Sequence, residues 1–245
     1  MAGKGSSTLD IPVMEYAGKF LSERIAPRAK ATHPFADAWD YLSRAVWTKD
    51  EASGQVRQFP ASVMHDGELR FDYLRYLTAE RPKHRVRAYE KSRRMLITWW
   101  LLALYLYDIM TEHNHLNAVA SDKLEKSAYL LGSDRMEFIY NHIPETVWPD
   151  KPVVKFEHRA GMSGWRTVRC ETTDSAIMAV ASGESQMQQY TFSNVLMDEF
   201  PRWQWQEESW RNIQPTTQGG GCVDIVCTAE LGSYAYDLLY DRVQR

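Results

Sequence analysis

The chain has 245 residues, of which 44% are hydrophobic and 25% are charged. This length and composition are typical of one large or two small globular domains, and they exclude a mostly disordered chain. Because the net charge is −3, no global positive field attracts the chain to nucleic acid, so such a contact requires a local basic patch.

The cysteines and the longest apolar segment also exclude some classes of protein. Cys170, Cys222 and Cys227 form no CxxC pair and are odd in number, which argues against a zinc site or a disulfide scaffold and fits a reducing compartment. No signal peptide is visible at the start of the sequence. The apolar run at residues 95–107 is shorter than the roughly 20 residues that span a membrane. We therefore expect a soluble intracellular protein.

The N-terminal part, residues 1–58, is weakly periodic and predicts a helical or irregular extension. Helices are expected at residues 16–28 and 35–47, followed by a loop at Gly54 and Pro60. Residues 59–245 predict one larger domain, which begins with a short helix at residues 71–80.

Strand and helix patterns alternate from Pro82 onward. Strands are expected at residues 85–90, 116–120, 177–181, 195–197 and 223–227, a hairpin at 153–158 and 167–171, and helices at 97–111, 123–142 and 206–213. Asp122 is a plausible cap of the helix at 123–142. Strands that are apolar on both faces and separated by helices indicate a mainly parallel α/β sheet. The hairpin is then an insertion or an antiparallel edge.

Two adjacent carboxylates, Asp198 and Glu199, end the apolar strand at residues 195–197. The carboxyl ends of parallel strands face the ligand crevice of such a sheet. An Asp there can hold magnesium through its oxygen atoms, and the neighbouring Glu can accept a proton from an attacking water. The pair predicts half of a phosphate-hydrolysing site, although alone such a pair is more often a strand end that meets solvent.

The loop between the strand at residues 85–90 and the helix at 97–111 is a candidate phosphate cradle. It lacks the usual GxxxxGK[ST] pattern, and its sequence is Lys91-Ser92-Arg93-Arg94-Met95-Leu96-Ile97-Thr98. Backbone N–H groups at the start of a helix point at an anion, and the Thr98 hydroxyl could contact magnesium. The alternative is a solvated basic turn ahead of a buried helix. Seven Lys and Arg residues fall within residues 81–94, and those not needed for phosphate could form a solvated face or contact DNA.

A third segment follows the last predicted strand. Thr228, Ala229 and Glu230 form a small polar triplet after that strand, as expected of the third motif of a motor ATPase. Together, the segments KSRRMLITW, YTFSNVLMDEF and CTAEL resemble the ATPase domain of the large terminase subunit of tailed bacteriophages, over about residues 59–240. The resemblance implies a RecA-like P-loop fold that binds ATP and Mg²⁺ and drives double-stranded DNA into a procapsid.

The resemblance also implies roles for single residues. Lys91 would replace the phosphate-binding lysine, since Ile97 occupies the usual place of that residue, and Arg94 matches the arginine of the terminase loop. Thr98 and Asp198 match the magnesium ligands, and Glu199 matches the catalytic glutamate. The remaining matches are the nucleotide-binding loop residues Ser92, Arg93, Met95, Leu96 and Ile97 and the coupling residues Thr228, Ala229 and Glu230.

The sequence departs from the terminase pattern in two places. Leu96 stands where many P-loops have glycine, so the loop must avoid positive φ there or bear strain. The stretch before the Asp198 strand has no arginine to serve as a finger acting on a neighbouring subunit. The candidates for that finger are Arg135, Arg159, Arg202 and Arg211.

The family further implies a portal protein and a small terminase subunit as partners, a homo-oligomeric ring on the portal, and location in the host cytoplasm. No nuclease domain follows the third motif, so we expect an isolated ATPase domain without nuclease activity, monomeric on its own. Trp203 and Trp205 could stack on DNA, but packing in the core or in a lid is the favoured interpretation. Two alternative functions remain: another DNA translocase or helicase-like ATPase, and a non-hydrolysing P-loop module for DNA binding or assembly.

Overall fold

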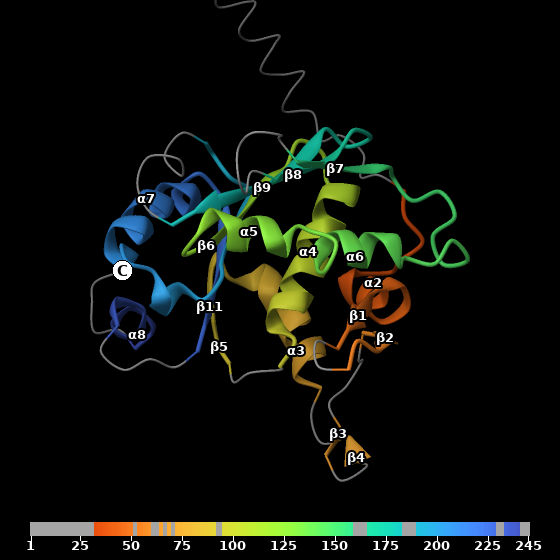
Figure 1. The fold of residues 1–245 in the computed structure, drawn as a ribbon, viewed down its shortest axis with the longest axis horizontal. Helices are drawn as coiled ribbons and strands as arrows, with labels where there is room; N and C mark the ends of the chain where they lie inside the picture. Colours follow the sequence, from red (N-terminus) through yellow and green to blue (C-terminus); the bar gives the residue numbers. More distant parts are fainter. Residues whose placement is uncertain are drawn as a thin grey trace, which may run out of the picture. The chain divides into compact units, whose positions relative to one another are not determined.

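The structure is a computed structural model, and it describes residues 32–50, 53–59, 64–65, 68–69, 72–91, 95–158, 166–182, 190–228 and 233–240. The helix expected at residues 16–28 lies outside these ranges. Within them, helices cover both faces of a seven-stranded sheet (Figure 1). The expected α/β class is therefore confirmed.

The sheet is parallel over most of its width. Its parallel neighbours are, in order, β5 (Val86–Glu90), β11 (Cys222–Cys227), β10 (Asn194–Met197), β6 (Leu116–Ser121) and β9 (Ser175–Ala181). The sheet continues through β8 (Arg166–Cys170), which pairs antiparallel with β9, and β7 (Val154–His158), which pairs antiparallel with β8. The predicted hairpin is thus the antiparallel edge of the main sheet.

Alternate strand residues face two separate apolar cores. One core lies under α2 (Ala38–Ala45), α3 (Tyr73–Glu80), α4 (Ile97–Thr111), α5 (Leu124–Leu130) and α6 (Met136–Asn141). The other lies under α7 (Gln206–Gln218), α8 (Tyr234–Leu239) and the short 3₁₀ helix η2 (Phe200–Arg202). Helix α4 has the bounds that the sequence predicts. Most of its residues are buried, as expected of an apolar helix between a sheet and further helices.

The segment expected as one helix at residues 123–142 is two helices, and that prediction is wrong. The chain turns between α5 and α6 at Gly132, whose N–H donates to the Tyr129 carbonyl at 2.9 Å. A Cβ atom at Gly132 would lie 2.5 Å from Nη1 of Arg166 and 3.2 Å from the Tyr129 carbonyl oxygen, so a larger residue there would displace the end of the Arg166 side chain. Asp122 does not cap α5. Lys123 takes that position, and the Asp122 carboxylate accepts a hydrogen bond from Lys126 Nζ at 2.7 Å.

Two small hairpins precede α3 and were not predicted. They are β1 (Trp47–Lys49) with β2 (Val56–Gln58), and β3 (Met64–His65) with β4 (Glu68–Leu69). The helix expected at residues 35–47 ends at Ala45 because Trp47 already pairs in β1. Gly54 turns the first hairpin with a φ of +70°. Helix α7 runs further than the expected 206–213 and continues through Pro215.

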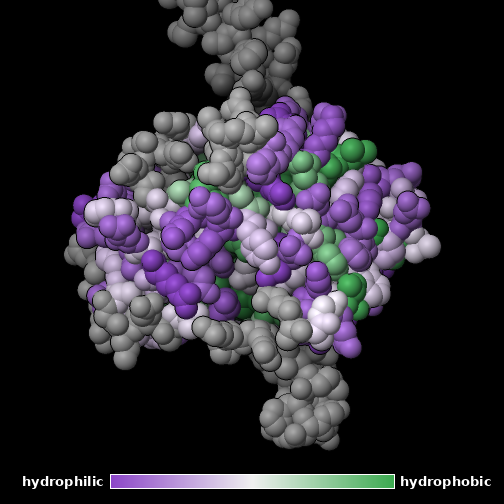
Figure 2. All heavy atoms as spheres, viewed as in Figure 1, coloured by the Kyte–Doolittle hydropathy of each residue, from purple (hydrophilic) through white to green (hydrophobic). Residues whose placement is uncertain are grey.

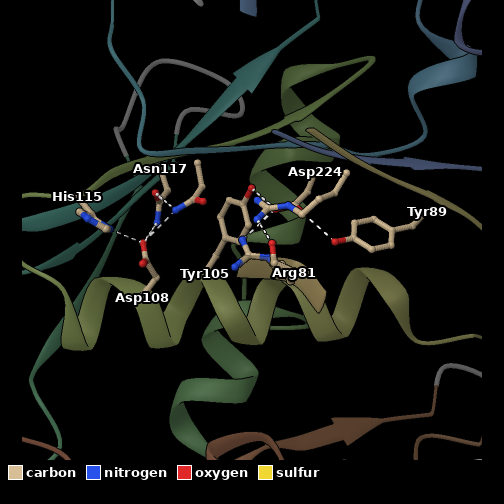
Figure 3. A network of polar contacts seen from close by, with 9 residues as sticks. Arg81, Tyr89, Tyr105, Asp108, His115, Asn117 and Asp224 are labelled. Atoms are coloured by element: carbon tan, nitrogen blue, oxygen red, sulfur yellow. Dashed lines mark hydrogen bonds and ion pairs between the residues drawn. The ribbon is translucent and has the colours of Figure 1, made fainter. Parts of the chain in front are cut away.

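A buried ionic network joins β11 to β5 and α4 (Figure 3). The Asp224 carboxylate is fully buried and accepts hydrogen bonds from Arg81 and Arg87 at 2.9 Å each. The hydroxyls of Tyr89 and Tyr105 donate to it at 3.1 and 3.0 Å. Arg81 belongs to the 3₁₀ helix η1 (Arg81–Lys83). Two cations of the basic segment thus neutralise an internal carboxylate, a role that the sequence analysis missed.

A second polar network lies further along α4 (Figure 3). The Oδ2 atom of Asp108 accepts a hydrogen bond from Asn117 Nδ2 at 2.7 Å, and the same oxygen lies 2.9 Å from His115 Nδ1. Asn194 of β10 donates to Asn117 at 3.1 Å. Hydrophilic residues cover most of the described surface on the face that Figure 2 shows, with hydrophobic residues in small scattered areas. In the described part of the chain, no helix is long and apolar enough to cross a membrane.

Candidate active site

The sheet brings the predicted motifs to one edge. Lys91 directly follows β5, and its N–H donates to the Cys227 carbonyl at the end of β11 at 2.9 Å. Asp198 directly follows β10, and its N–H donates to the Ala120 carbonyl of β6 at 2.9 Å. Because all of these strands are parallel, the residues after them meet at the carboxyl edge, as the sequence predicts.

The first turn of α4 contacts the carboxylate after β10. Thr98 Oγ1 donates a hydrogen bond of 3.0 Å to Asp198 Oδ1. Thr98 is the second residue of α4, so its hydroxyl lies at the positive end of the helix dipole. The hydroxyl and carboxylate oxygens form a hard donor pair of the type that magnesium prefers.

Glu199 lies between two cations. Its Oε1 atom is 3.7 Å from Lys91 Nζ, and its Oε2 atom is 3.4 Å from Arg202 Nε. Oε2 is buried and accepts no hydrogen bond from the described residues. The backbone of Glu199 has a φ of +53°, which is rare for a residue with a side chain. The carboxylate on this turn thus faces Lys91 on one side and Arg202 on the other.

Asp198 is the titratable group that its surroundings perturb most clearly at this edge. Burial raises its pKa to about 6, and the charge of Glu199 acts in the same direction. The Thr98 hydrogen bond and the charges of Lys91 and Arg135 oppose this rise. The carboxylate is thus desolvated and lacks full compensation by cations, which favours the binding of a further positive charge beside it.

A cavity of about 740 Å³ opens at this edge. Its lining includes Lys91, Met95, Leu96, Ile97, Thr98, Trp99, Asp198 and Glu199, together with Thr48, Lys49, Asp50 and Arg57 of the first hairpin and Ser121, Lys126, Tyr129, Leu130 and Arg135. This lining contains more Lys and Arg than Asp and Glu. The sequence analysis missed the contribution of the first hairpin, because no motif marks it.

The loop backbone bears the strain that the missing glycine implies. Leu96 has a φ of +58° and a ψ of 12°, the left-handed conformation that glycine adopts without cost. The Leu96 carbonyl accepts the N–H of Trp100 at 2.9 Å and so begins the hydrogen-bond ladder of α4. The Tyr73 hydroxyl donates to the Met95 carbonyl. The loop thus joins α4 through Leu96, which has a strained backbone, and the preceding residue Met95 is held by a hydrogen bond from Tyr73.

Some of the predicted site residues lie outside the described residues. They are Ser92, Arg93 and Arg94 of the loop, Ala229 and Glu230 of the third motif, and the finger candidate Arg159. Thr228 is described, and it is partly buried directly after β11. Lys91, Met95, Leu96, Ile97, Thr98, Asp198 and Glu199 all line the one cavity.

The other finger candidates occupy three different settings. Arg135 lines the cavity. Arg202 pairs with Glu199, and its side chain is 52% exposed. Arg211 pairs with Glu207 at 2.6 Å on α7, with its side chain 71% exposed. Of these three, Arg135 is the residue whose side chain the cavity already holds.

The two tryptophans after Glu199 differ in their surroundings. Trp203 is buried, and its Nε1–H donates to the Asp198 carbonyl at 3.0 Å, so the expected packing is confirmed there. Trp205 is 50% exposed, and for this residue the expectation of packing is wrong. Trp203 therefore supports the turn that carries both carboxylates.

The donor set fits a magnesium-bound nucleoside triphosphate. Thr98 and Asp198 supply paired oxygen ligands, and Glu199 Oε2 is a buried acceptor with no hydrogen-bond donor among the described residues. The excess of cations along the cavity matches the negative charge of the phosphates. A desolvated carboxylate, a cation-lined cavity and a helix N-terminus at the carboxyl edge of a parallel sheet are the features of a phosphate-binding site in an α/β fold.

Three solved structures that are similar to this chain are large terminases or a domain of one. The large terminase of bacteriophage HK97 matches with a TM-score of 0.58 at 11% identity, over 86% of this chain and 41% of that protein. A variant of the large terminase ATPase domain of Thermus phage P74-26 has a TM-score of 0.48 at 13% identity over 66% of each chain. The large terminase of another thermophilic bacteriophage has a TM-score of 0.43 at 14% identity, over 63% of this chain and 37% of that one.

The HK97 likeness shows the fold, which this chain shares with part of that large terminase. The chain spans less than half the length of the HK97 protein. Neither a protein-family model nor a curated protein sequence matches the chain.

Proposed function

We propose that this chain is a terminase-like motor ATPase that hydrolyses ATP to move double-stranded DNA. The observation that carries the proposal is the convergence of Lys91, Thr98, Asp198 and Glu199 on one cavity, from two segments that are distant in sequence. The shared fold with the HK97 large terminase supports it.

The proposed reaction uses the chain's residues in separate roles. Lys91 binds the phosphates, together with Arg94 and the N–H groups of the loop at residues 91–98. Glu199 takes a proton from a water molecule while the water oxygen forms a bond to the terminal phosphorus. The bond from that phosphorus to the bridging oxygen breaks, and the leaving oxygen stays on the diphosphate. Because such transition states are loose, positioned charge supplies most of the acceleration.

Thr98 and Asp198 would hold Mg²⁺. The bound ion would neutralise charge on the phosphate oxygens during transfer. Before a ligand enters, the Asp198 carboxylate accepts a hydrogen bond from the Thr98 hydroxyl, and Glu199 faces Lys91. Thr228, Ala229 and Glu230 would link loss of the phosphate to movement, and the Lys91–Cys227 backbone hydrogen bond provides a direct connection between their strand and the loop.

The biological setting proposed from the resemblance is packaging of a viral genome in the host cytoplasm. The partners would be double-stranded DNA, a portal protein and a small terminase subunit, with several copies of the chain in a ring on the portal. We propose no nuclease activity for these residues. Residues 59–245 would form most of the ATPase domain, and α2 and the first hairpin, which fall within the expected extension at residues 1–58, would belong to it because they pack in its core and line its cavity.

The decisive experiment compares Glu199→Gln with the wild type. The amide keeps the size of the side chain and cannot take a proton, so ATP binding should remain within about threefold while hydrolysis falls by about 10²–10⁴-fold. Binding is measured by titration with a fluorescent ATP analogue and hydrolysis by phosphate release. Glu208→Gln, an exposed position on α7, is the matched control and should change neither quantity.

Each alternative result has a definite meaning. Wild-type turnover in Glu199→Gln would show that Glu199 is not the base. ATP binding without hydrolysis in the wild type, with or without DNA, would favour the non-hydrolysing module. Absence of nucleotide binding with magnesium would overturn the proposed function. DNA-stimulated hydrolysis by the wild type is the result expected of a translocation motor.

A further inference from the structure

We propose that Arg135 is a catalytic residue that contacts the terminal phosphoryl group of ATP within its own subunit. This inference rests on the proposed function and assigns a residue that the three sequence motifs do not include. Arg135 lies in the turn between α5 and α6 and lines the same cavity as Thr98, Asp198 and Glu199.

Two aromatic rings hold the Arg135 guanidinium. Its central carbon lies 4.9 Å from the centroid of the Trp99 ring and 5.0 Å from that of Tyr129. Trp99 belongs to the first turn of α4 and directly follows Thr98, and both rings line the cavity. An arginine stacks through its plane, whereas its N–H donors lie in that plane and suit phosphate oxygens. The guanidinium is therefore oriented before any ligand arrives.

The N-cap position of Arg135 does not by itself account for an arginine. Arg135 is the N-cap residue of α6, with a φ of −138° and a ψ of −102°, and its side chain makes no capping hydrogen bond. Such a position ordinarily favours Ser, Thr, Asp or Asn, which can accept a helix N–H. Its Nη1 atom donates to the neighbouring Asp134 carbonyl at 2.8 Å. The long cation extends into the cavity wall, where charge can act on a ligand.

Arg135 lines the same cavity as Lys91 and Asp198, so its charge lies on the wall that faces the proposed metal ligands. The other described candidates differ, since Arg202 pairs with Glu199 and Arg211 pairs with Glu207 on the opposite face of the sheet. A fixed donor in a partly closed site stabilises charge that develops in the transition state without reorganisation cost. Arg135 can thus supply in cis the charge that an arginine finger supplies in trans.

The test measures binding of ADP and of a non-hydrolysable ATP analogue, each with magnesium, at a concentration where light scattering shows monomers. Arg135→Ala should weaken binding of the triphosphate analogue at least tenfold and leave ADP binding within about twofold. In a monomer, such a selective loss arises in cis. Arg135→Lys keeps the charge and loses the planar stacking, so its loss should be intermediate. Arg211→Ala is the control and should alter neither affinity.

Hydrolysis provides the second measurement. Arg135→Ala should reduce it by about 10³–10⁵-fold, which is the range of known arginine fingers. Equal weakening of ADP and the triphosphate analogue, or unchanged affinity for both, would overturn the inference. So would recovery of hydrolysis when Arg135→Ala is mixed with Lys91→Ala, because that recovery requires an arginine from a neighbour. If the wild type binds neither nucleotide, the proposed function fails, and this result is distinct from every Arg135 outcome.

Discussion

The Thr98 hydroxyl donates to the Asp198 carboxylate at 3.0 Å, although 100 positions separate the two residues in sequence. The contact joins the start of the most buried helix to the end of a central strand. The Asp198 carboxylate in this contact has a pKa that burial raises, and a buried carboxylate of this kind affects the stability of the fold.

Asp198→Asn should stabilise the nucleotide-free protein and abolish hydrolysis. The pKa of Asp198 is about 6 in the folded protein, against 3.8 for an ordinary Asp. A carboxyl whose pKa is raised by folding lowers stability increasingly as the pH rises toward that folded value. The gain should therefore be on the order of 1–3 kcal/mol at pH 8 and smaller at pH 5. Denaturant titrations at both pH values measure it, and an equal gain at both would contradict the assignment.

Lys91→Ala should weaken binding of a triphosphate analogue at least tenfold, because Lys91 lines the cavity and its side chain is 13% exposed. The matched control in the same basic segment is Lys83→Ala, since Lys83 is 61% exposed and pairs with Glu80. Lys83→Ala should change affinity less than twofold. Arg81 is unsuitable as a control, because it binds Asp224. Equal losses from the two variants would indicate a diffuse field and no phosphate cradle.

Asp224→Ala should destabilise the protein by about 3–5 kcal/mol, because it leaves Arg81 and Arg87 as buried cations without their carboxylate. Burial alone would raise the pKa of Asp224, but the charges of the two arginines outweigh it and hold the pKa below 3.8. A lowered pKa gives stability that is present above pH 3.8 and is lost as the pH falls through the folded value. The difference between variant and wild type in urea titrations should therefore shrink in acid. A difference that stays constant down to pH 2 would contradict this account.

Leu96→Gly should be more stable than Leu96→Ala by about 1 kcal/mol, which reverses the ordinary order of the two residues. Both variants lose the leucine side chain, but only glycine relieves a φ of +58°. Urea titration of the two variants isolates the backbone strain from the lost packing. A more stable alanine variant would contradict a left-handed backbone conformation at Leu96.

Sequence patterns predicted the elements whose signals are local. The unbroken apolar run gave the bounds of α4, and the short apolar segments marked the strands of the main sheet. The break between α5 and α6 escaped prediction because apolar residues continue at helical spacing on both sides of Gly132, where the chain turns. The first hairpin escaped because its three-residue strands carry little periodicity.

The residues of the candidate site also fall into those that local sequence patterns predict and those that only the folded structure brings together. The pair Asp198 and Glu199 was recognisable because strand ends in a parallel sheet have a fixed place. The partners of Arg81 and Arg87 were not recognisable, since Asp224 lies within an otherwise apolar strand and only the folded sheet places it beside β5. Trp99, Tyr129 and Arg135 come from two helices and a turn, and no sequence spacing relates them.

Strand β11 gives the protein a built-in position for a spectroscopic label. The chain's three cysteines are free thiols, of which Cys170 and Cys227 are buried and Cys222 is partly exposed. Burial also raises the pKa of Cys227 to about 11, so little of its reactive thiolate exists at neutral pH. A maleimide dye should therefore attach first to Cys222, at the end of β11 opposite Thr228. The unaltered sequence then carries a fluorophore on the strand that precedes the proposed coupling residues, at the end of that strand away from the cavity.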